Sequence, residues 1–226
     1  MIRFFDLVFA SLAIIVLSPV LVPVAILLRL TGEGEVFFRQ TRIGLHGKSF
    51  RLWKFATMQK NSPNIGTGVL TLKNDPRVLP VGRFLRRAKI NELPQLLNVL
   101  SGDMSLVGPR PQAVLIFGYF PPHTQDVLKT VRPGLSGLGS ILFRDEESIV
   151  DTAADKESFY RRLVSPYKGE IECWYARHQS TRLYFSLIFL TLWVLAFPRS
   201  QLPWRVLRGL PSPPLELRQA MQTGTA

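Results

Sequence analysis

The chain has 226 residues and a formal net charge of +12, with 28 lysines and arginines against 16 acidic residues. This excess favours an anionic partner, such as nucleic acid, anionic lipid or a phosphate-bearing substrate. The mean hydropathy is +0.14, which is unusual for a basic soluble protein and favours a membrane surface over nucleic acid. The single cysteine, Cys173, excludes an intrachain disulfide, and the scattered histidines lack zinc-ligand spacing.

The N-terminal region contains an uncharged apolar run over residues 7–28, which is long enough to cross a bilayer as a helix. Ser18-Pro19 lies near its middle. Proline removes a backbone donor, so we expect the helix to kink or break there. Two topologies are open: a kinked single span with its N-terminus outside, and a re-entrant hairpin that returns to the same leaflet. Arg3 before the run and Arg29 after it do not separate them, and the pattern alone favours the kinked span.

Residues 36–60 mix basic and aromatic side chains and contain no acidic residue. The positive-inside rule places such a segment on the cytoplasmic side of the membrane, and interleaved rings and cations suit a headgroup interface. An amphipathic β-hairpin that turns at Leu45-His46-Gly47 is also compatible with this pattern. The basic residues are Arg39, Arg42, Lys48, Arg51, Lys54 and Lys60.

The central region reads as short helices separated by turns. Residues 81–89 predict a basic helix. Asn91 is a candidate helix cap, with Glu92 in the first turn and Pro94 at an early helical position. We expect this second helix to stop near Gly102. The basic residues of the first helix are Arg83, Arg86, Arg87 and Lys89.

Two glycine- and proline-rich loops are expected, over residues 104–111 and 131–139. In the first, Arg110 lies between two prolines and has little backbone freedom. Its guanidinium could therefore grip a phosphate bidentately, although a surface arginine in a rigid turn is the plainer alternative. The second loop contains Arg132 and matches neither a Walker nor a Rossmann spacing.

An acidic cluster follows, in which Arg144 precedes Asp145, Glu146 and Glu147. It is either a solvated charge run at a helix start or a metal- or proton-handling site that faces bound phosphates. Further on, residues 183–197 are apolar but too few to cross a bilayer comfortably. Flanking arginines and tryptophans indicate an interfacial helix, with a buried core helix as the alternative. Residues 211–226 are expected to form a flexible tail.

Several segments resemble the bacterial sugar transferases, the monotopic polyprenyl-phosphate phosphoglycosyltransferases. The resemblance covers about residues 3–197, and its Glu-Leu-Pro-Gln-Leu and Gly-Pro-Arg-Pro blocks are long and specific. The matching segments are residues 37–44, 53–58, 75–78, 91–100, 102–111 and 132–134.

The resemblance implies a compact α/β (α+β) catalytic domain on the cytoplasmic face of the bacterial inner membrane. In this family the N-terminal helix is re-entrant and broken at a Ser-Pro pair, which Ser18 and Pro19 match, so the resemblance reverses the ranking from pattern alone. The implied divisions are a re-entrant helix (1–30), a catalytic domain (31–182), interfacial helices (183–210) and a flexible tail (211–226). The chain resembles the minimal catalytic unit of the family.

The implied reaction moves a phosphosugar from a UDP-sugar to undecaprenyl phosphate, gives a polyprenyl diphosphate sugar and UMP, and uses Mg²⁺. It would begin the assembly of exopolysaccharide, capsule or another glycoconjugate. Anionic lipids are expected partners, nucleic acid is not, and a homodimer is left open. Cations must neutralise two phosphorylated substrates that repel each other. The arginines expected to do so are Arg86, Arg110, Arg132 and Arg144.

The family's Asp-Glu pair, in which the Asp attacks phosphorus, is Asn91-Glu92 here. An amide is a poor nucleophile, which leaves four accounts: Glu92 attacks, a carboxylate near Arg144 attacks, the lipid phosphate attacks directly, or the chain is an inactive membrane scaffold of the same fold. The expected catalytic residues are Asn91, Glu92, Asp145 and Glu146, with Glu92 and Asp145 as metal ligands.

Overall fold

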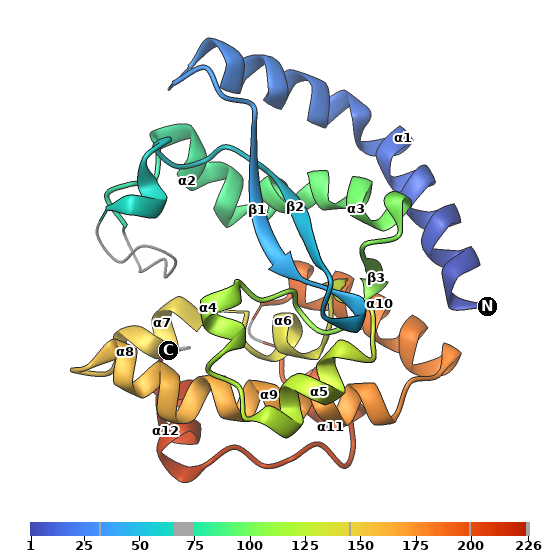
Figure 1. Ribbon diagram of the computed structural model, residues 1–226, viewed down its shortest axis with the longest axis vertical. Coiled ribbons are helices and arrows are strands. Elements are labelled where there is room, and N and C mark those ends of the chain that lie inside the picture. The colour runs from blue at the N-terminus through green and yellow to red at the C-terminus, as the bar shows by residue number, and fades with distance from the viewer. Residues whose placement is uncertain (32, 66–74, 145, 199, 225–226) are drawn as a thin grey trace.

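The computed structural model describes residues 1–31, 33–65, 75–144, 146–198 and 200–224. Helices dominate, and the strands form two small two-stranded sheets (Figure 1). This mixed composition agrees with the expected α/β class. The helices are α1 (Ile2–Leu30), α2 (Pro80–Arg87), α3 (Leu96–Ser101), α4 (Val114–Phe117), α5 (Pro122–Lys129), α6 (Leu138–Leu142), α7 (Glu146–Asp151), α8 (Lys156–Phe159), α9 (Ser165–Arg177), α10 (Thr181–Ala196), α11 (Leu202–Val206) and α12 (Leu215–Gly224). The strands are β1 (Phe37–Ile43), β2 (Ser49–Phe55), β3 (Ser105–Val107) and β4 (Gly134–Ser136).

The first sheet is the predicted hairpin. β1 and β2 pair antiparallel from Phe37 opposite Phe55 to Ile43 opposite Ser49. The short 3-10 turn Leu45–Gly47 joins them, and both His46 and Gly47 have positive φ angles there. The Asn98 side chain of α3 forms two hydrogen bonds with the backbone of β2. Its Oδ1 accepts from the Trp53 N–H and its Nδ2 donates to the Arg51 carbonyl, each at 2.9 Å.

The second sheet lies inside the two segments expected to be loops. β3 and β4 pair in parallel, with Ser105 opposite Gly134 and Val107 opposite Ser136. A Cβ atom on Gly134 would lie 2.0 Å from the Gly108 nitrogen. These glycines therefore allow two backbone segments to approach closely, and the expectation of plain loops over 104–111 and 131–139 is wrong.

α1 runs without interruption through Pro19 and Pro23, so the break expected at Ser18-Pro19 is absent from the backbone. Proline at position 19 removes the N–H that would bond to the Ile15 carbonyl. The Ser18 hydroxyl donates to that carbonyl at 2.8 Å and restores the lost hydrogen bond. The helix bends along its length instead of breaking (Figure 1).

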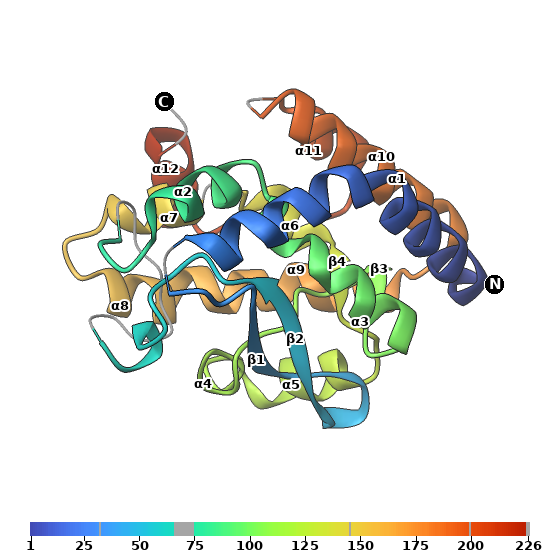
Figure 2. The same cartoon turned by 90° about the horizontal axis from the view of Figure 1, so that it is seen from above.

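Both ends of α1 contact the same compact body. Near its N-terminus, Arg3 donates to the Val99 and Leu100 carbonyls at 2.6 and 3.1 Å. Near its C-terminus, Leu28 is buried with Phe55 and Leu85. A straight helix of this length covers about 43 Å, and Figures 1 and 2 show it lying along the domain.

A buried carboxylate also fixes the first turns of α1. Asp6 is 1% exposed. Its Oδ1 accepts from the Ser105 hydroxyl, the Leu106 N–H and the Tyr184 hydroxyl at 2.9 to 3.0 Å. Since these partners belong to β3 and α10, Asp6 ties three elements together and sets where α1 crosses the domain.

The apolar helix α10 is buried on one side, as the core-helix alternative expects, and its interfacial placement stays a prediction. Tyr184, Leu187 and Leu190 are buried in a core cluster with Val107 and Leu138. Other apolar residues of α10 are exposed, and the helix lies beside α1 (Figure 2). Rings from the two helices meet there. The exposed apolar residues of α10 are Phe185, Phe189, Leu192 and Leu195.

The C-terminal segment differs from the expected flexible tail. α12 packs against α7, and its Leu217 and Ala220 are buried in the core cluster that contains Ile149 and Tyr167. The Tyr167 hydroxyl also donates to the Pro211 carbonyl at 2.9 Å. The prediction of a tail over 211–226 is therefore wrong for α12, which completes the core.

Candidate active site

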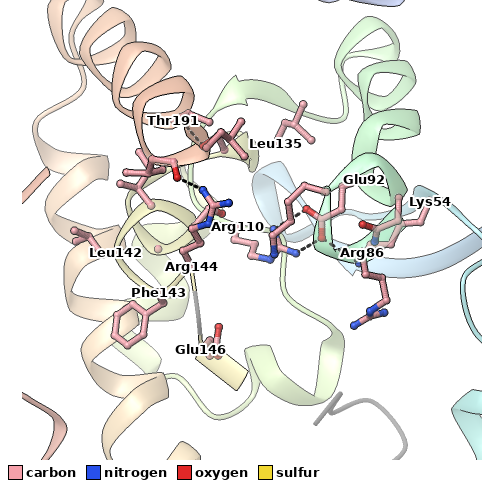
Figure 3. A pocket seen from close by; sticks show the side chains of 18 of the residues that line it. Lys54, Arg86, Glu92, Arg110, Leu135, Leu142, Phe143, Arg144, Glu146 and Thr191 are labelled. Atoms are coloured by element: carbon pink, nitrogen blue, oxygen red, sulfur yellow. Dashed lines mark hydrogen bonds and ion pairs between the residues drawn. The ribbon is translucent and has the colours of Figure 1, made fainter. Parts of the chain in front are cut away.

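A cleft of about 2390 Å³ opens between α1, the hairpin, α2, α6, α7 and α10. Apolar residues of α1, including Phe9, Ala13 and Leu17, line one part of it. Charged residues line the part shown in Figure 3. One cleft therefore joins an apolar helix surface to a cluster of charged side chains.

Glu92 is the centre of the charged cluster. Its Oε1 lies 2.5 Å from Nη2 of Arg110, and its Oε2 lies 3.2 Å from Nη1, which makes a bidentate pair (Figure 3). The Lys54 ammonium lies 4.0 Å from Oε1. The side chains of Glu92, Lys54 and Arg110 are 16%, 19% and 32% exposed. Both carboxylate oxygens thus face cations within a half-buried site.

Local backbone structure explains how these side chains meet. Glu92 lies in the 3-10 turn Ile90–Gln95, which starts after Lys89 in a left-handed conformation. Asn91 lies inside this turn. The cap positions are occupied by Lys89 for the turn and by Gln95 for α3, so the predicted role of Asn91 as a helix cap is wrong. Arg110 follows β3 between its two prolines, as the sequence indicates, and Lys54 comes from β2.

The electrostatics of the cluster follow from burial and crowding. Burial acts to raise the pKa of Glu92, but Arg110 and Lys54 outweigh it and hold that pKa below its usual range. Glu92 in turn raises the pKa of Arg110 against the effect of burial. Burial lowers the pKa of Lys54 to about 7, Glu92 opposes the shift, and the nearby arginines add to it. Burial and Arg110 lower the pKa of Arg42 to about 10.

A second ion pair lies at another wall of the cleft. The Lys168 ammonium, on a side chain that is 4% exposed, lies 2.6 Å from Oε2 of Glu146. It also lies 5.6 Å from the centre of the Phe143 ring. Burial and then Glu146 raise the pKa of Tyr160 well above its usual value. Glu146 and Arg110 are close enough to interact electrostatically.

Cations outnumber carboxylates around these two pairs. Such an excess favours the binding of anions with several charges, including diphosphates and phosphate monoesters. The cations that line the cleft near the two glutamates include Arg42, Lys54, Arg86, Arg110 and Lys168.

The structure brings together most of the residues predicted from the sequence. Asn91, which is 6% exposed, and Arg86 line the cleft, and Figure 3 shows Arg86 close to Glu92 and Lys54. Arg144 also lines the cleft, and its Nη1 donates to the Val194 carbonyl. Ser18 and Pro19 lie within α1.

Two predicted residues are not part of this cluster. Arg132 is not among the residues that line the cleft, and its Nε donates to the Gly102 carbonyl at 2.9 Å. This hydrogen bond gives Arg132 a structural contact, and its phosphate contact stays a prediction. Asp145, predicted as a catalytic residue and a metal ligand, lies outside the described residues.

Sequence reasoning did not select Lys54 or Lys168 as site residues. A usable signal existed for Lys54, because side chains alternate along a strand and the apolar Leu52 is two residues away. Leu52 is buried, and Lys54 points to the same side of β2. Lys168 lies in the first turn of α9, and no local pattern distinguishes it from a solvated lysine.

The described carboxylates do not fit a magnesium ion held by protein ligands. Both oxygens of Glu92 pair with Arg110, and Oε2 of Glu146 pairs with Lys168. No group of three His, Cys, Asp or Glu side chains with metal-binding geometry occurs among the residues described. Mg²⁺ usually binds through one or two carboxylates and substrate phosphates, whereas these carboxylates are already neutralised by cations.

Comparison with known proteins shows the family. A sequence model described as bacterial sugar transferase matches residues 1–198. The UDP-glucose:undecaprenyl-phosphate glucose-1-phosphate transferase of Escherichia coli (strain K12) is 39% identical over 83% of this chain and 38% of its own length. The uncharacterized sugar transferase EpsL of Bacillus subtilis (strain 168) is 36% identical over 84% of both chains.

A third relative is named for another sugar. The UDP-N-acetylgalactosamine-undecaprenyl-phosphate N-acetylgalactosaminephosphotransferase of Aeromonas hydrophila is 38% identical over 62% of this chain and 33% of its own length. This chain therefore spans less than half the length of the Escherichia coli and Aeromonas relatives. The family match covers most of the chain and includes both ion pairs of the cleft, and so the chain belongs to the bacterial sugar transferase family.

Proposed function

We propose that this chain transfers a sugar phosphate from a UDP-sugar to undecaprenyl phosphate. In the product, an oxygen of the lipid phosphate is bonded to the β-phosphorus of the UDP-sugar. The bond from that phosphorus to the oxygen shared with the α-phosphate breaks, and UMP leaves with this oxygen. The observation that carries the proposal is the single cleft that joins the apolar surface of α1 to the cations around Glu92.

The relatives support this reaction and leave the sugar open. The Escherichia coli protein is named for glucose 1-phosphate, and the Aeromonas protein is named for N-acetylgalactosamine. Both names include undecaprenyl phosphate, which unites a long apolar chain with an anionic head. An apolar surface that continues into a cationic cluster suits that combination.

The position of α1 supports a re-entrant placement on the cytoplasmic face of the inner membrane. A helix that crossed the bilayer once would carry Arg3 about 30 Å or more away from the domain on the other side. Arg3 and Leu28, at opposite ends of α1, instead both contact the domain. The outward side chains of α1 are apolar, and Ile15 and Val16 are 69% and 64% exposed. Together with the outer face of α10, they would lie in one leaflet while the cleft opens beside the headgroups.

Three routes to the product start from this site. In the first route, Glu92 attacks phosphorus with an oxygen that pairs with Arg110 in this structure. Glu146 pairs with Lys168 through Oε2 and its side chain is 27% exposed. In the third route the lipid phosphate attacks directly. The first two pass through an acyl phosphate on the protein, whereas the third forms no covalent intermediate.

Asn91 supports one alternative function, a membrane scaffold of the same fold that performs no transfer. Its amide lines the cleft next to Glu92, at the position where the resemblance places a nucleophilic aspartate. The excess of cations over carboxylates in the cleft favours the enzyme, because a scaffold does not need to bind phosphates.

The test is UMP release by the full chain in nanodiscs, measured with a panel of UDP-sugars and with undecaprenyl phosphate present or absent. The wild type is compared with Asn91→Asp, Glu92→Gln, Glu146→Gln and Asp145→Asn. We expect lipid-dependent UMP release by the wild type. Intact mass measured after rapid quenching would show a phosphosugar adduct for either covalent route, and would show none for direct attack.

The outcomes separate the candidate functions. Loss of the adduct in only one of the three variants Glu92→Gln, Glu146→Gln and Asp145→Asn identifies the nucleophile. If the wild type releases no UMP and Asn91→Asp does, the site is intact and lacks its nucleophile. If neither the wild type nor Asn91→Asp releases UMP from any of the UDP-sugars, the transfer reaction is refuted and the scaffold is favoured.

A further inference from the structure

Glu172 of α9 is buried behind the charged cluster and does not line the cleft. It is 3% exposed. Its Oε1 accepts from the backbone N–H of Arg110 at 3.3 Å and from that of Gly139 at 3.2 Å. One carboxylate oxygen therefore joins the segment after β3 to the first turn of α6.

The fold makes room for this carboxylate. A Cβ atom on Gly139 would lie 2.5 Å from Oε1 of Glu172, so any larger residue there would displace this carboxylate. Oε2 has no hydrogen-bond partner among the residues that the structure describes. Burial raises the pKa of Glu172 to about 7, while the two backbone donors and Lys168 act in the opposite direction. Burying a charged carboxylate costs free energy. A neutral side chain could accept the same two backbone hydrogen bonds at a lower cost.

The two ionisable side chains that α9 buries here act on the two ion pairs of the cleft. Lys168 and Glu172 are four residues apart and so lie on the same face of the helix. Lys168 contacts Glu146, and Glu172 contacts the backbone of Arg110, the partner of Glu92. A shift of α9 would therefore move both pairs.

We infer that Glu172 is a positioning residue, which holds the backbone of Arg110 so that the guanidinium meets Glu92 and the substrate phosphates in one orientation. The inference rests on the proposed transfer reaction for its kinetic consequence, but the contact itself can be tested without turnover. Prolines flank Arg110 and carry no amide hydrogen. The neighbouring residues therefore add no exchanging amide, and the signal of the Arg110 amide is easier to assign.

The experiment compares Glu172→Ala, Glu172→Gln and Glu170→Ala in nanodiscs. Glu170 is exposed on the same helix and serves as the control. Hydrogen exchange of the peptide that contains Arg110 is followed by mass spectrometry, and kcat and KM for UMP release are measured in parallel. Loss of the acceptor in Glu172→Ala should speed exchange at Arg110 and lower kcat about 100-fold, because small misplacements at a reacting centre cost this much.

Glu172→Gln keeps a carbonyl acceptor in the same place, so we expect it to restore the protection of Arg110 and to bring kcat within about tenfold of the wild type. Glu170→Ala should match the wild type in both measurements. Normal exchange at Arg110 in Glu172→Ala would overturn the inference, as would faster exchange with a normal kcat. If Glu172→Ala does not fold, exchange at Arg110 in Glu172→Gln that is as fast as for an unprotected amide overturns it. A wild type without turnover would refute the proposed function, and the exchange result would still decide the contact.

Discussion

At the scale of single residues, the structure separates arginines that the sequence grouped together. Arg110 forms a bidentate pair with Glu92 in the cleft, while Arg132 donates to a backbone carbonyl away from it. Both precede or follow a proline in a segment rich in glycine. The local sequence thus shows that an arginine is rigidly held but does not show what it faces, because strand pairing over long distances decides that.

Replacement of Arg110 by lysine tests this distinction. Lysine keeps the charge but loses the fork that holds two oxygens at once. We expect Arg110→Lys to lower kcat/KM for UMP release about 100-fold, the usual cost of removing one oriented donor from a charge-stabilising site. Arg132→Lys, the matched control, should stay close to the wild type. Equal losses in the two variants would contradict the assignment of Arg132 to a structural contact.

The pH dependence of the reaction provides a test of Lys54. Since its pKa is lowered to about 7, the ammonium of the free enzyme loses its proton as the pH rises above 7. The charged form attracts the diphosphate, so kcat/KM should fall about fivefold between pH 7 and pH 8, as a single titration at pH 7 gives. A bound phosphate keeps the lysine charged, and kcat should change less.

Two variants isolate the contribution of Lys54 from that of other groups. Lys54→Met should lower kcat/KM at pH 7 and reduce its fall between pH 7 and pH 8. Lys48→Met, at an exposed position in the hairpin turn, should keep the wild-type profile. Glu172 titrates in the same window, which is why the slope is compared between variants. An unchanged slope in Lys54→Met would show that another group titrates.

At the scale of elements, the main question about topology is whether α1 crosses the membrane or returns to the same side. The hydrogen bonds of Arg3 and Asp6 place the start of α1 against the domain, and Leu28 places its end there too. We expect a cysteine inserted after Met1 to be labelled by a membrane-impermeant maleimide in inverted inner-membrane vesicles and not in intact spheroplasts. Lys48→Cys, on the exposed hairpin turn, should behave identically. The native Cys173 is buried and should stay unlabelled.

The same labelling can contradict the re-entrant placement. Reaction of the N-terminal cysteine in intact spheroplasts, with Lys48→Cys protected there, would mean that α1 crosses the bilayer once. In that case the hydrogen bonds of Arg3 and Asp6 could not form in the membrane. Because α1 is continuous through Pro19, the proposed re-entrant placement depends on the bend of α1 and its contacts with the domain and not on a helix break.

Elements with a strong local signal were predicted correctly. The hairpin follows from alternating apolar and basic residues around a glycine-bearing turn, and the stop of α3 follows from Gly102, whose φ angle is 92°. β3 and β4 were missed because each is only three residues long and surrounded by glycine and proline. Their pairing depends on contacts between segments about thirty residues apart, which no local pattern encodes.

At the scale of the whole molecule, the C-terminal segment completes both the core and the cleft. Residues 199–226 lie beyond the family match. Within the described part of that segment, Trp204, Arg218 and Met221 line the cleft. Leu217 is fully buried beside α7 and α9. The position of residues 211–226 at the end of the chain favoured a flexible tail. Tertiary packing, and not the pattern, makes this helix part of the domain.

A leucine pair on α12 measures how much the domain depends on this packing. Leu217 is 0% exposed and Leu215 is 70% exposed. Truncation of a buried leucine removes apolar contacts and leaves a cavity, so Leu217→Ala should lower the free energy of unfolding by about 2–5 kcal/mol. Leu215→Ala should change it by less than about 0.5 kcal/mol. Denaturant unfolding followed by tryptophan fluorescence measures both, since Trp204 packs against the same cluster.

The activity of these variants shows whether the segment also shapes the cleft. If α12 only adds stability, Leu217→Ala measured well below its unfolding temperature should keep the wild-type kcat/KM. We expect a loss instead, with KM for the UDP-sugar raised more than kcat is lowered, because α7, on which α12 packs, begins with Glu146 at the wall of the cleft. Equal stability of the two leucine variants would contradict the packing of α12 and return residues 211–226 to the role of a tail.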